Sequence, residues 1–154
     1  MLTAARFNTS QFDVSTFRAH GYLDARFDGN IAYHQASGPF NLEFIQTLQK
    51  TLQALHAIVQ PVGAWAEILT INDSAIMSLA AYEAMDQMTG RLLQQGRAAA
   101  AIAHVCGPDV EGHTIMAIQY EKLFRKHQLP YRSFDSLADA EAWVAEVLQA
   151  NIAA

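Results

Sequence analysis

The chain has 154 residues, of which 51% are hydrophobic and 16% charged, and its formal net charge is −5 at pH 7. This composition excludes intrinsic disorder, and the length suits one domain with a complete hydrophobic core. The acidic balance makes nucleic acid an unfavourable partner, and the single cysteine, Cys106, excludes an internal disulfide.

Two features of the sequence bear on location. No apolar run approaches the roughly 20 residues of a membrane-spanning helix. Residues 1–7 also lack the apolar stretch of a signal peptide. We therefore expect a cytoplasmic protein without integral membrane association.

The first third of the chain predicts a loose segment, a hairpin and a helix. Residues 1–16 are rich in Thr, Ser, Asn and Gln and are expected to form a loose N-terminal segment, with residues 17–154 as a single domain. Residues 22–27 and 31–37 are expected strands, because Asp28-Gly29-Asn30 between them is a turn sequence. Apolar residues at helical spacing then predict a helix that begins after Asn41, its N-cap, and ends before Pro61.

The rest of the chain alternates strands and helices. Residues 65–71 predict a strand, Leu79 to Leu93 a helix, and residues 98–105 a strand that is apolar enough to be buried on both faces. Three further elements follow: a helix after Gly112 that Pro130 ends, a short strand at residues 131–134, and an amphipathic helix capped by Ser136.

The expected element order is therefore ββαβαβαβα. Alternating strands and helices imply a mostly parallel sheet, and the opening hairpin makes that sheet mixed. We predict an α/β fold with a five-stranded sheet and about four helices.

Three short segments carry a family resemblance. They are Ala36–Asn41 (Ala-Ser-Gly-Pro-Phe-Asn), Trp65–Ser74 (Trp-Ala-Glu-Ile-Leu-Thr-Ile-Asn-Asp-Ser), and Leu129–Phe134 followed by Ala140–Trp143. In sequence and order they resemble the SpoIIAA-like fold of STAS domains and SEC14-type lipid-binding modules, above all small stand-alone bacterial proteins of this group. The resemblance covers about residues 20 to 150 in the order of elements.

The resemblance also implies a regulatory serine. STAS anti-sigma-factor antagonists are phosphorylated on a Ser in an Asp-Ser step after the corresponding strand, and Asp73-Ser74 stands at a similar place. The family pattern continues with Gly and Leu, whereas Ala75 and Ile76 follow here. The alternative interpretation makes Ser74 an ordinary loop or N-cap residue.

Ligands of open α/β sheets gather at the carboxyl ends of the parallel strands. This places a candidate ligand or partner loop at Asn72, Asp73, Ser74 and Asp109. It also places His104 and Cys106 at the end of the next strand, where their spacing puts both side chains on one face.

A neighbouring imidazole can lower a thiol pKa, so Cys106 is a candidate nucleophile with His104 as its base and Asp73 as the group that orients the base. The alternative is structural, because a free cysteine usually packs as a small apolar side chain. The six histidines are dispersed and no phosphate-binding loop occurs, so we predict neither a metal nor a cofactor.

Three functions remain open at this point. The leading hypothesis is a non-catalytic regulatory or interaction domain that binds a protein partner or a small apolar ligand and is switched at Ser74. The second is a small enzyme that uses Cys106, His104 and Asp73. The third is a lipid-binding module of the SEC14 type, and a homodimer is an open alternative for the oligomeric state.

Overall fold

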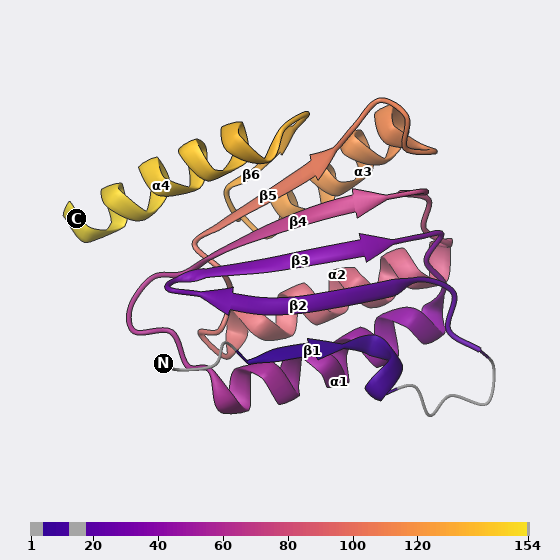
Figure 1. The fold of residues 1–154 in the computed structure, drawn as a ribbon, viewed down its shortest axis with the longest axis horizontal. Coiled ribbons are helices and arrows are strands. Elements are labelled where there is room, and N and C mark those ends of the chain that lie inside the picture. Colours follow the sequence, from indigo (N-terminus) through magenta and orange to yellow (C-terminus); the bar gives the residue numbers. More distant parts are fainter. Residues whose placement is uncertain (1–4, 13–17, 154) are drawn as a thin grey trace.

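The computed structural model describes residues 5–12 and 18–153 and contains a six-stranded sheet in the order β1-β2-β3-β4-β5-β6 (Figure 1). The strands are β1 (Arg6–Asn8), β2 (Tyr22–Asp28), β3 (Ile31–Ser37), β4 (Ala66–Asn72), β5 (Ala101–Cys106) and β6 (Tyr131–Phe134). The helices are α1 (Leu42–Ile58), α2 (Leu79–Gln94), α3 (His113–Lys126) and α4 (Leu137–Ala153), with a short 3-10 helix, η1 (Thr9–Gln11), after β1. From β2 onward the element order is the predicted one.

The local signals in the sequence account for several element boundaries. The β2–β3 hairpin turns at Gly29, whose φ of 58° lies in the left-handed region that glycine adopts without strain. Asn41 caps α1 as expected, because its side-chain oxygen accepts a hydrogen bond from the Phe44 amide at 3.0 Å. Every residue of β5 is buried, which confirms the prediction of a strand covered on both faces.

The sheet is mixed, as predicted, but the predicted count of five strands is wrong. Strands β3 to β6 pair in parallel, and β2 is antiparallel to both of its neighbours. The additional strand is β1, where Phe7 pairs with Ala25 at the edge of the sheet. The three residues of β1 are too few to show a periodic pattern of apolar side chains. This strand forms because the edge of β2 offers free backbone hydrogen-bonding groups. Residues 1–4 and 13–16 of the segment expected to be loose lie outside the described residues.

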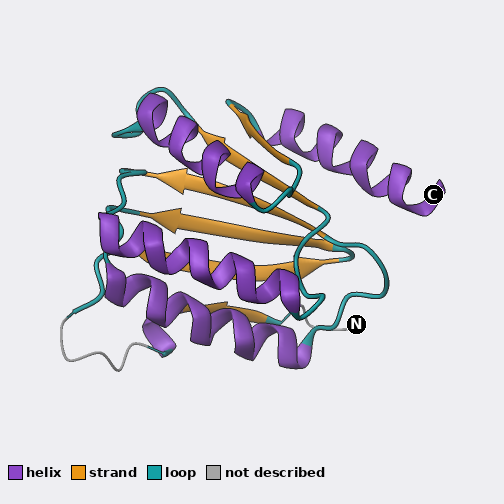
Figure 2. Ribbon diagram, turned by 180° about the vertical axis from the view of Figure 1, so that it is seen from behind, coloured by secondary structure: helices purple, strands orange, loops and turns teal. Residues whose placement is uncertain are grey.

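The helices cover the two faces of the sheet unequally. Helices α1, α2 and α3 lie over one face (Figure 2), where the larger core is built around residues such as Phe44, Leu55 and Leu123. Helix α4 lies on the opposite face, and its buried Ala140 and Val144 pack against β4 and β5. The outward side chains of β1 and β2 are left without a covering helix, whereas Ile31 and Tyr33 of β3 pack beside α4, and the Tyr33 hydroxyl donates to Glu141 at 2.9 Å.

Candidate functional site

The loop predicted to bind a ligand after β4 is held by the loop that follows β5. The Ala75 amide donates to the Glu111 carbonyl at 2.8 Å, and the Glu111 amide donates to the Asp73 carbonyl at 3.0 Å. Asp73 has a φ of 61° and an exposed side chain. Asp109 is exposed on the neighbouring loop. These backbone hydrogen bonds hold the loop after β4 closely against the loop after β5.

Ser74 does not stand at a helix N-terminus. Its hydroxyl oxygen accepts from the Ile76 amide at 3.2 Å, and the residue is only 3% exposed. Helix α2 begins at Leu79, and its N-cap is Ser78, whose hydroxyl oxygen accepts from the Ala81 amide at 3.1 Å. Ser74 is therefore a loop residue, which is one of the two structural roles expected for it, and it is not the N-cap, because the chain runs four residues further before the helix starts.

The predicted catalytic group is not assembled around His104. His104 and Cys106 do share the inward face of β5, but the His104 ring is enclosed by the rings of Tyr120, Phe124 and Tyr131. Its Nδ1 atom lies 3.1 Å from the Tyr131 hydroxyl oxygen, and its Nε2 atom has no partner among the described residues. Burial lowers the pKa of His104 to about 3.

Asp73 therefore does not orient His104. Cys106 is buried, and burial raises the pKa of its thiol, where the catalytic hypothesis requires a lowered one. Both side chains have the features of core residues.

The prominent apolar space in the protein lies at the opposite end of the sheet. Two adjoining cavities, each of about 70 Å³, open between α1 and α2 beside the first residues of β4 and β5. Leu52 from α1 and Met88 and Leu92 from α2 line both of them. Trp65, directly before β4, forms a further shared wall. The deeper cavity continues beneath α2 to Ile102 and Leu129.

Two titratable side chains project into this apolar space from the sheet. His34 on β3 and Glu67 on β4 line both cavities, and their Nε2 and Oε2 atoms lie 4.0 Å apart. This separation is too long for a hydrogen bond. The Nδ1 atom of His34 is buried and has no partner in the described part of the chain. Burial lowers the pKa of His34 to about 4 and raises the pKa of Glu67 to about 7.

Aromatic rings and arginines form the entrance. The His56 ring packs edge-on to Trp65 at 5.1 Å between centroids and to Phe27 at 5.6 Å. Burial, and the nearby charge of Arg97, lower the pKa of His56. Arg91 and Arg97 are exposed residues at the rim, together with the amide side chains of Gln49, Gln53 and Gln95.

Sequence reasoning placed the site at the carboxyl ends of the strands and did not single out these residues. A usable signal was present, because His34 and Glu67 occupy inward positions of strands whose other inward residues are Ala32, Ala36, Leu69 and Ile71. A titratable side chain among these apolar residues is costly to bury, so its presence indicates a candidate functional position.

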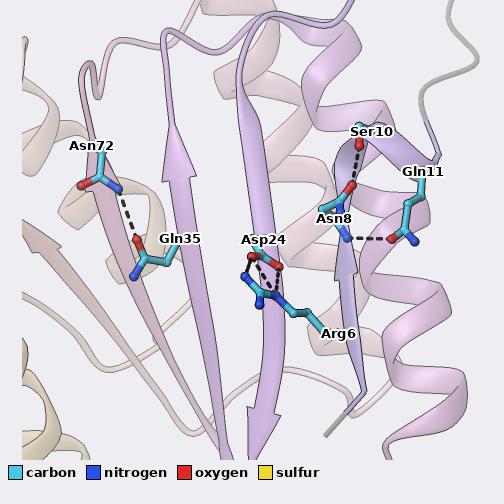
Figure 3. A network of polar contacts seen from close by, with 7 residues as sticks. All are labelled: Arg6, Asn8, Ser10, Gln11, Asp24, Gln35 and Asn72. Atoms are coloured by element: carbon cyan, nitrogen blue, oxygen red, sulfur yellow. Dashed lines mark hydrogen bonds and ion pairs between the residues drawn. The ribbon is translucent and has the colours of Figure 1, made fainter.

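A second depression, of about 410 Å³, lies on the uncovered half of the sheet. Figure 3 shows the polar side chains of this face bound to one another: Arg6 forms an ion pair with Asp24, and the Asn72 amide donates to Gln35 at 3.4 Å. Asn72, one of the predicted loop residues, therefore belongs to this face. Arg6, Asp24, Gln35 and Asn72 are therefore already engaged within the protein.

The described residues contain neither a metal-binding group nor a membrane-spanning helix. In this part of the chain no group of three His, Cys, Asp or Glu side chains is placed to hold a metal ion. Nor does any described helix combine the length and apolar character needed to cross a membrane.

Comparison with known proteins identifies the type of fold. No protein-family model and no curated protein matches the chain. Among solved structures, the chain is similar to an uncharacterized protein of the DUF3478 family from Shewanella loihica, which has a SpoIIAA-like fold. The match has a TM-score of 0.55 at 11% sequence identity and covers 85% of this chain and 98% of the other. The chain is therefore an α/β domain with a SpoIIAA-like fold, as its sequence motifs predicted.

Proposed function

We propose that the chain is a non-catalytic binding domain whose ligand is a small, largely apolar molecule held between α1 and α2. The observation that carries this proposal is the pair of adjoining cavities with shared walls of Leu52, Trp65, Met88 and Leu92. Apolar pockets with a few convergent polar groups and titratable residues of shifted pKa are the usual form of small-molecule sites. His34 and Glu67 supply those polar groups here.

The cavity volumes bound the size of the ligand. An apolar cavity of about 150 Å³ is enough to bind benzene, whereas sites for drug-sized molecules run from roughly 300 to 1,000 Å³. Two adjoining cavities of about 70 Å³ each therefore suit one ring or one short alkyl chain. A two-chain lipid, as expected for a SEC14-type module, would require α1 and α2 to move apart.

Catalysis at Cys106, a switch at Ser74 and binding of a protein partner have less physical support. Catalysis by Cys106 meets a buried thiol of raised pKa and a histidine that Asp73 does not contact. A switch at Ser74 meets a residue that is only 3% exposed, which leaves little access for a kinase. For a protein partner, the uncovered sheet face offers polar side chains that already bind one another.

Trp65 provides a direct test of the proposal. A Trp143→Phe variant leaves Trp65 as the single tryptophan, because the chain has two. Titration of this variant with 1-octanol is expected to change Trp65 fluorescence in a saturable way. Native mass spectrometry of freshly purified wild-type protein is expected to show a retained small molecule that organic extraction removes.

A cavity-filling variant supplies the matched control. Ala98 lines the deeper cavity, so Ala98→Leu is expected to abolish the octanol response, whereas Ala142→Leu on the exposed side of α4 is expected to preserve it. Thermal unfolding of both variants verifies that they fold. Absence of an octanol response in the folded Trp143→Phe protein, together with no retained molecule, would overturn the proposal. A cytoplasmic location and a homodimer stay predictions.

A further inference from the structure

Arg91 and Arg97 stand at the mouth of the cavities without acidic partners. The Arg91 guanidinium donates to the Gln49 side-chain oxygen at 3.3 Å. Within the described residues, no carboxylate lies within ion-pair distance, 4.0 Å, of either arginine. Both side chains nevertheless line the same cavity.

The chain as a whole carries carboxylates that could pair with cations such as these two arginines. The protein has 15 acidic and 10 basic residues, so carboxylates are in excess. Several of the other cations use them: Arg6 pairs with Asp24, Arg125 with Glu121, and Lys126 with Asp86. The neighbours of Arg91 and Arg97 at the rim are instead the neutral amides Gln49, Gln53 and Gln95.

Behind the arginines the cavity is apolar. Leu52, Met88 and Leu92 form its walls, and Glu67 is the one carboxyl group among its described lining residues. A pKa of about 7 leaves the Glu67 carboxyl largely neutral below that pH. The site therefore combines an apolar interior with two cationic groups at a solvent-exposed rim.

We infer that the ligand is a small amphipathic carboxylate, whose head is held by Arg91 and Arg97 and whose apolar tail lies between α1 and α2. Guanidinium groups bind carboxylates through paired charge-assisted hydrogen bonds, and the guanidinium fork matches the planar carboxylate. Placement at the rim keeps the carboxylate partly hydrated, which limits the desolvation cost of the ion pair. This inference rests on the proposed function and specifies its ligand class.

Glu67 gives the binding a pH dependence of defined sign. The other titratable and charged groups that line this cavity with Glu67 are His34 from β3, His56 from α1, Arg91 from α2, and Arg97 from the segment before β5. Above pH 7 an ionised Glu67 repels the carboxylate of the ligand. Protonation of Glu67 removes this repulsion, so an anionic ligand is expected to bind more tightly at pH 6 than at pH 8.

The test compares octanoate with 1-octanol, which share the same hydrocarbon length and differ in charge. Isothermal titration calorimetry of the wild-type protein at pH 6 is expected to show tighter binding of octanoate. Arg91→Gln with Arg97→Gln is expected to weaken octanoate binding about tenfold or more and to leave octanol within about twofold. Arg132→Gln, which removes the same charge from the opposite face of the sheet at β6, is expected to change neither.

Glu67→Gln supplies an independent measurement at pH 8. This variant is expected to bind octanoate several-fold more tightly than the wild-type protein does. Equal affinities for octanoate and octanol, or an unchanged octanoate affinity in the folded double arginine variant, would overturn the inference and leave the apolar site intact. Failure of both probes to bind would instead overturn the proposed function together with the inference.

Discussion

His34 and Glu67 lie on neighbouring parallel strands with their Nε2 and Oε2 atoms 4.0 Å apart, in an apolar space where neither can hold a charge at low cost. Burial shifts their pKa values in opposite directions, so both are driven toward the neutral form. A neutral pair at this position preserves the apolar character of the cavity. Through these two residues the free energy of unfolding also changes with pH in opposite directions.

The first prediction concerns Glu67. The pKa of Glu67 in the folded protein, about 7, is above its ordinary value of 4.5, so its contribution to stability is fully present below pH 4.5 and is lost as the pH rises through 7. Glu67→Gln is expected to stabilise the protein at pH 8 by on the order of 2 kcal/mol and to have a much smaller effect at pH 5. Urea unfolding at both pH values measures the difference.

A matched control for this prediction is Glu83→Gln, which removes an exposed carboxylate from α2. It is expected to have the same small effect at both pH values. A Glu67→Gln variant whose stability relative to wild type is independent of pH would contradict the assignment of a buried, pKa-shifted carboxyl.

The second prediction concerns His34. Its pKa is lowered from 6.5 to about 4, so the unfolded chain takes up a proton between these values while the folded protein does not. In the Glu67→Gln background the protein is therefore expected to lose stability as the pH falls from 7 to 5, and an added His34→Leu is expected to remove about 1 to 2 kcal/mol of that loss. The comparison is made in the Glu67→Gln background, because Glu67 has the opposite sign over the same range.

Urea unfolding at pH 7 and pH 5 provides the measurement, with exposed His20→Gln as the control. If His34→Leu loses as much stability on acidification as its parent, the imidazole is protonated in the folded protein and is not buried as described.

The third prediction concerns the Cys106 thiol. Because the side chain is buried and its thiol pKa is raised, iodoacetamide is expected to alkylate the folded protein at least about tenfold more slowly than the urea-unfolded chain at pH 8. Mass spectrometry over time gives both rates. A folded-state rate equal to that of the unfolded chain, or one that persists at pH 6, would restore the catalytic hypothesis for Cys106 and His104.

The fourth prediction concerns the close approach of Gly38 to the loop after β4. A Cβ at this position would overlap the Ser74 carbonyl oxygen, which is backbone and cannot move aside cheaply. Gly38→Ala is expected to cost about 2 to 3 kcal/mol of the free energy of unfolding. Gly107→Ala, where nothing lies within 4 Å of the added carbon, is expected to stay within about 0.5 kcal/mol of wild type. Equal stabilities of the two variants would show that the loop is free to shift.

The fifth prediction concerns Ser74 as a switch. Ser74→Asp mimics the charge of a phosphoserine and is expected to destabilise the protein by about 2 kcal/mol or more, because it buries a carboxylate at a residue that is only 3% exposed. Ser78→Asp, at the exposed N-cap of α2, is expected to be nearly neutral. Thermal unfolding separates the two, and a stable Ser74→Asp protein would revive the phosphorylation hypothesis.

Local physics explains why the element order was predictable from the sequence. The Gly29 turn, the Asn41 cap and the strand Tyr131–Phe134 depend on residues within a few positions of each other. Two motifs of the SpoIIAA-like resemblance, Ala36–Asn41 and Leu129–Phe134, include the Asn41 cap and this strand. Strand β1 was not predicted, because its three residues are positioned by pairing with β2 and not by a local sequence pattern.

The local pattern marks His34 and Glu67 individually, as titratable residues among apolar ones, but it does not show that they share a site. The sequence alone determined the alternation of strands and helices and a core large enough for one domain, because backbone conformation responds to periodicity, caps and turns. Only the tertiary structure decided that His34, Glu67, Trp65 and Arg91 meet at one cavity. Their meeting depends on the register of β3 against β4 and on how α1 and α2 lie across the sheet, and both are set by packing between segments far apart in the chain.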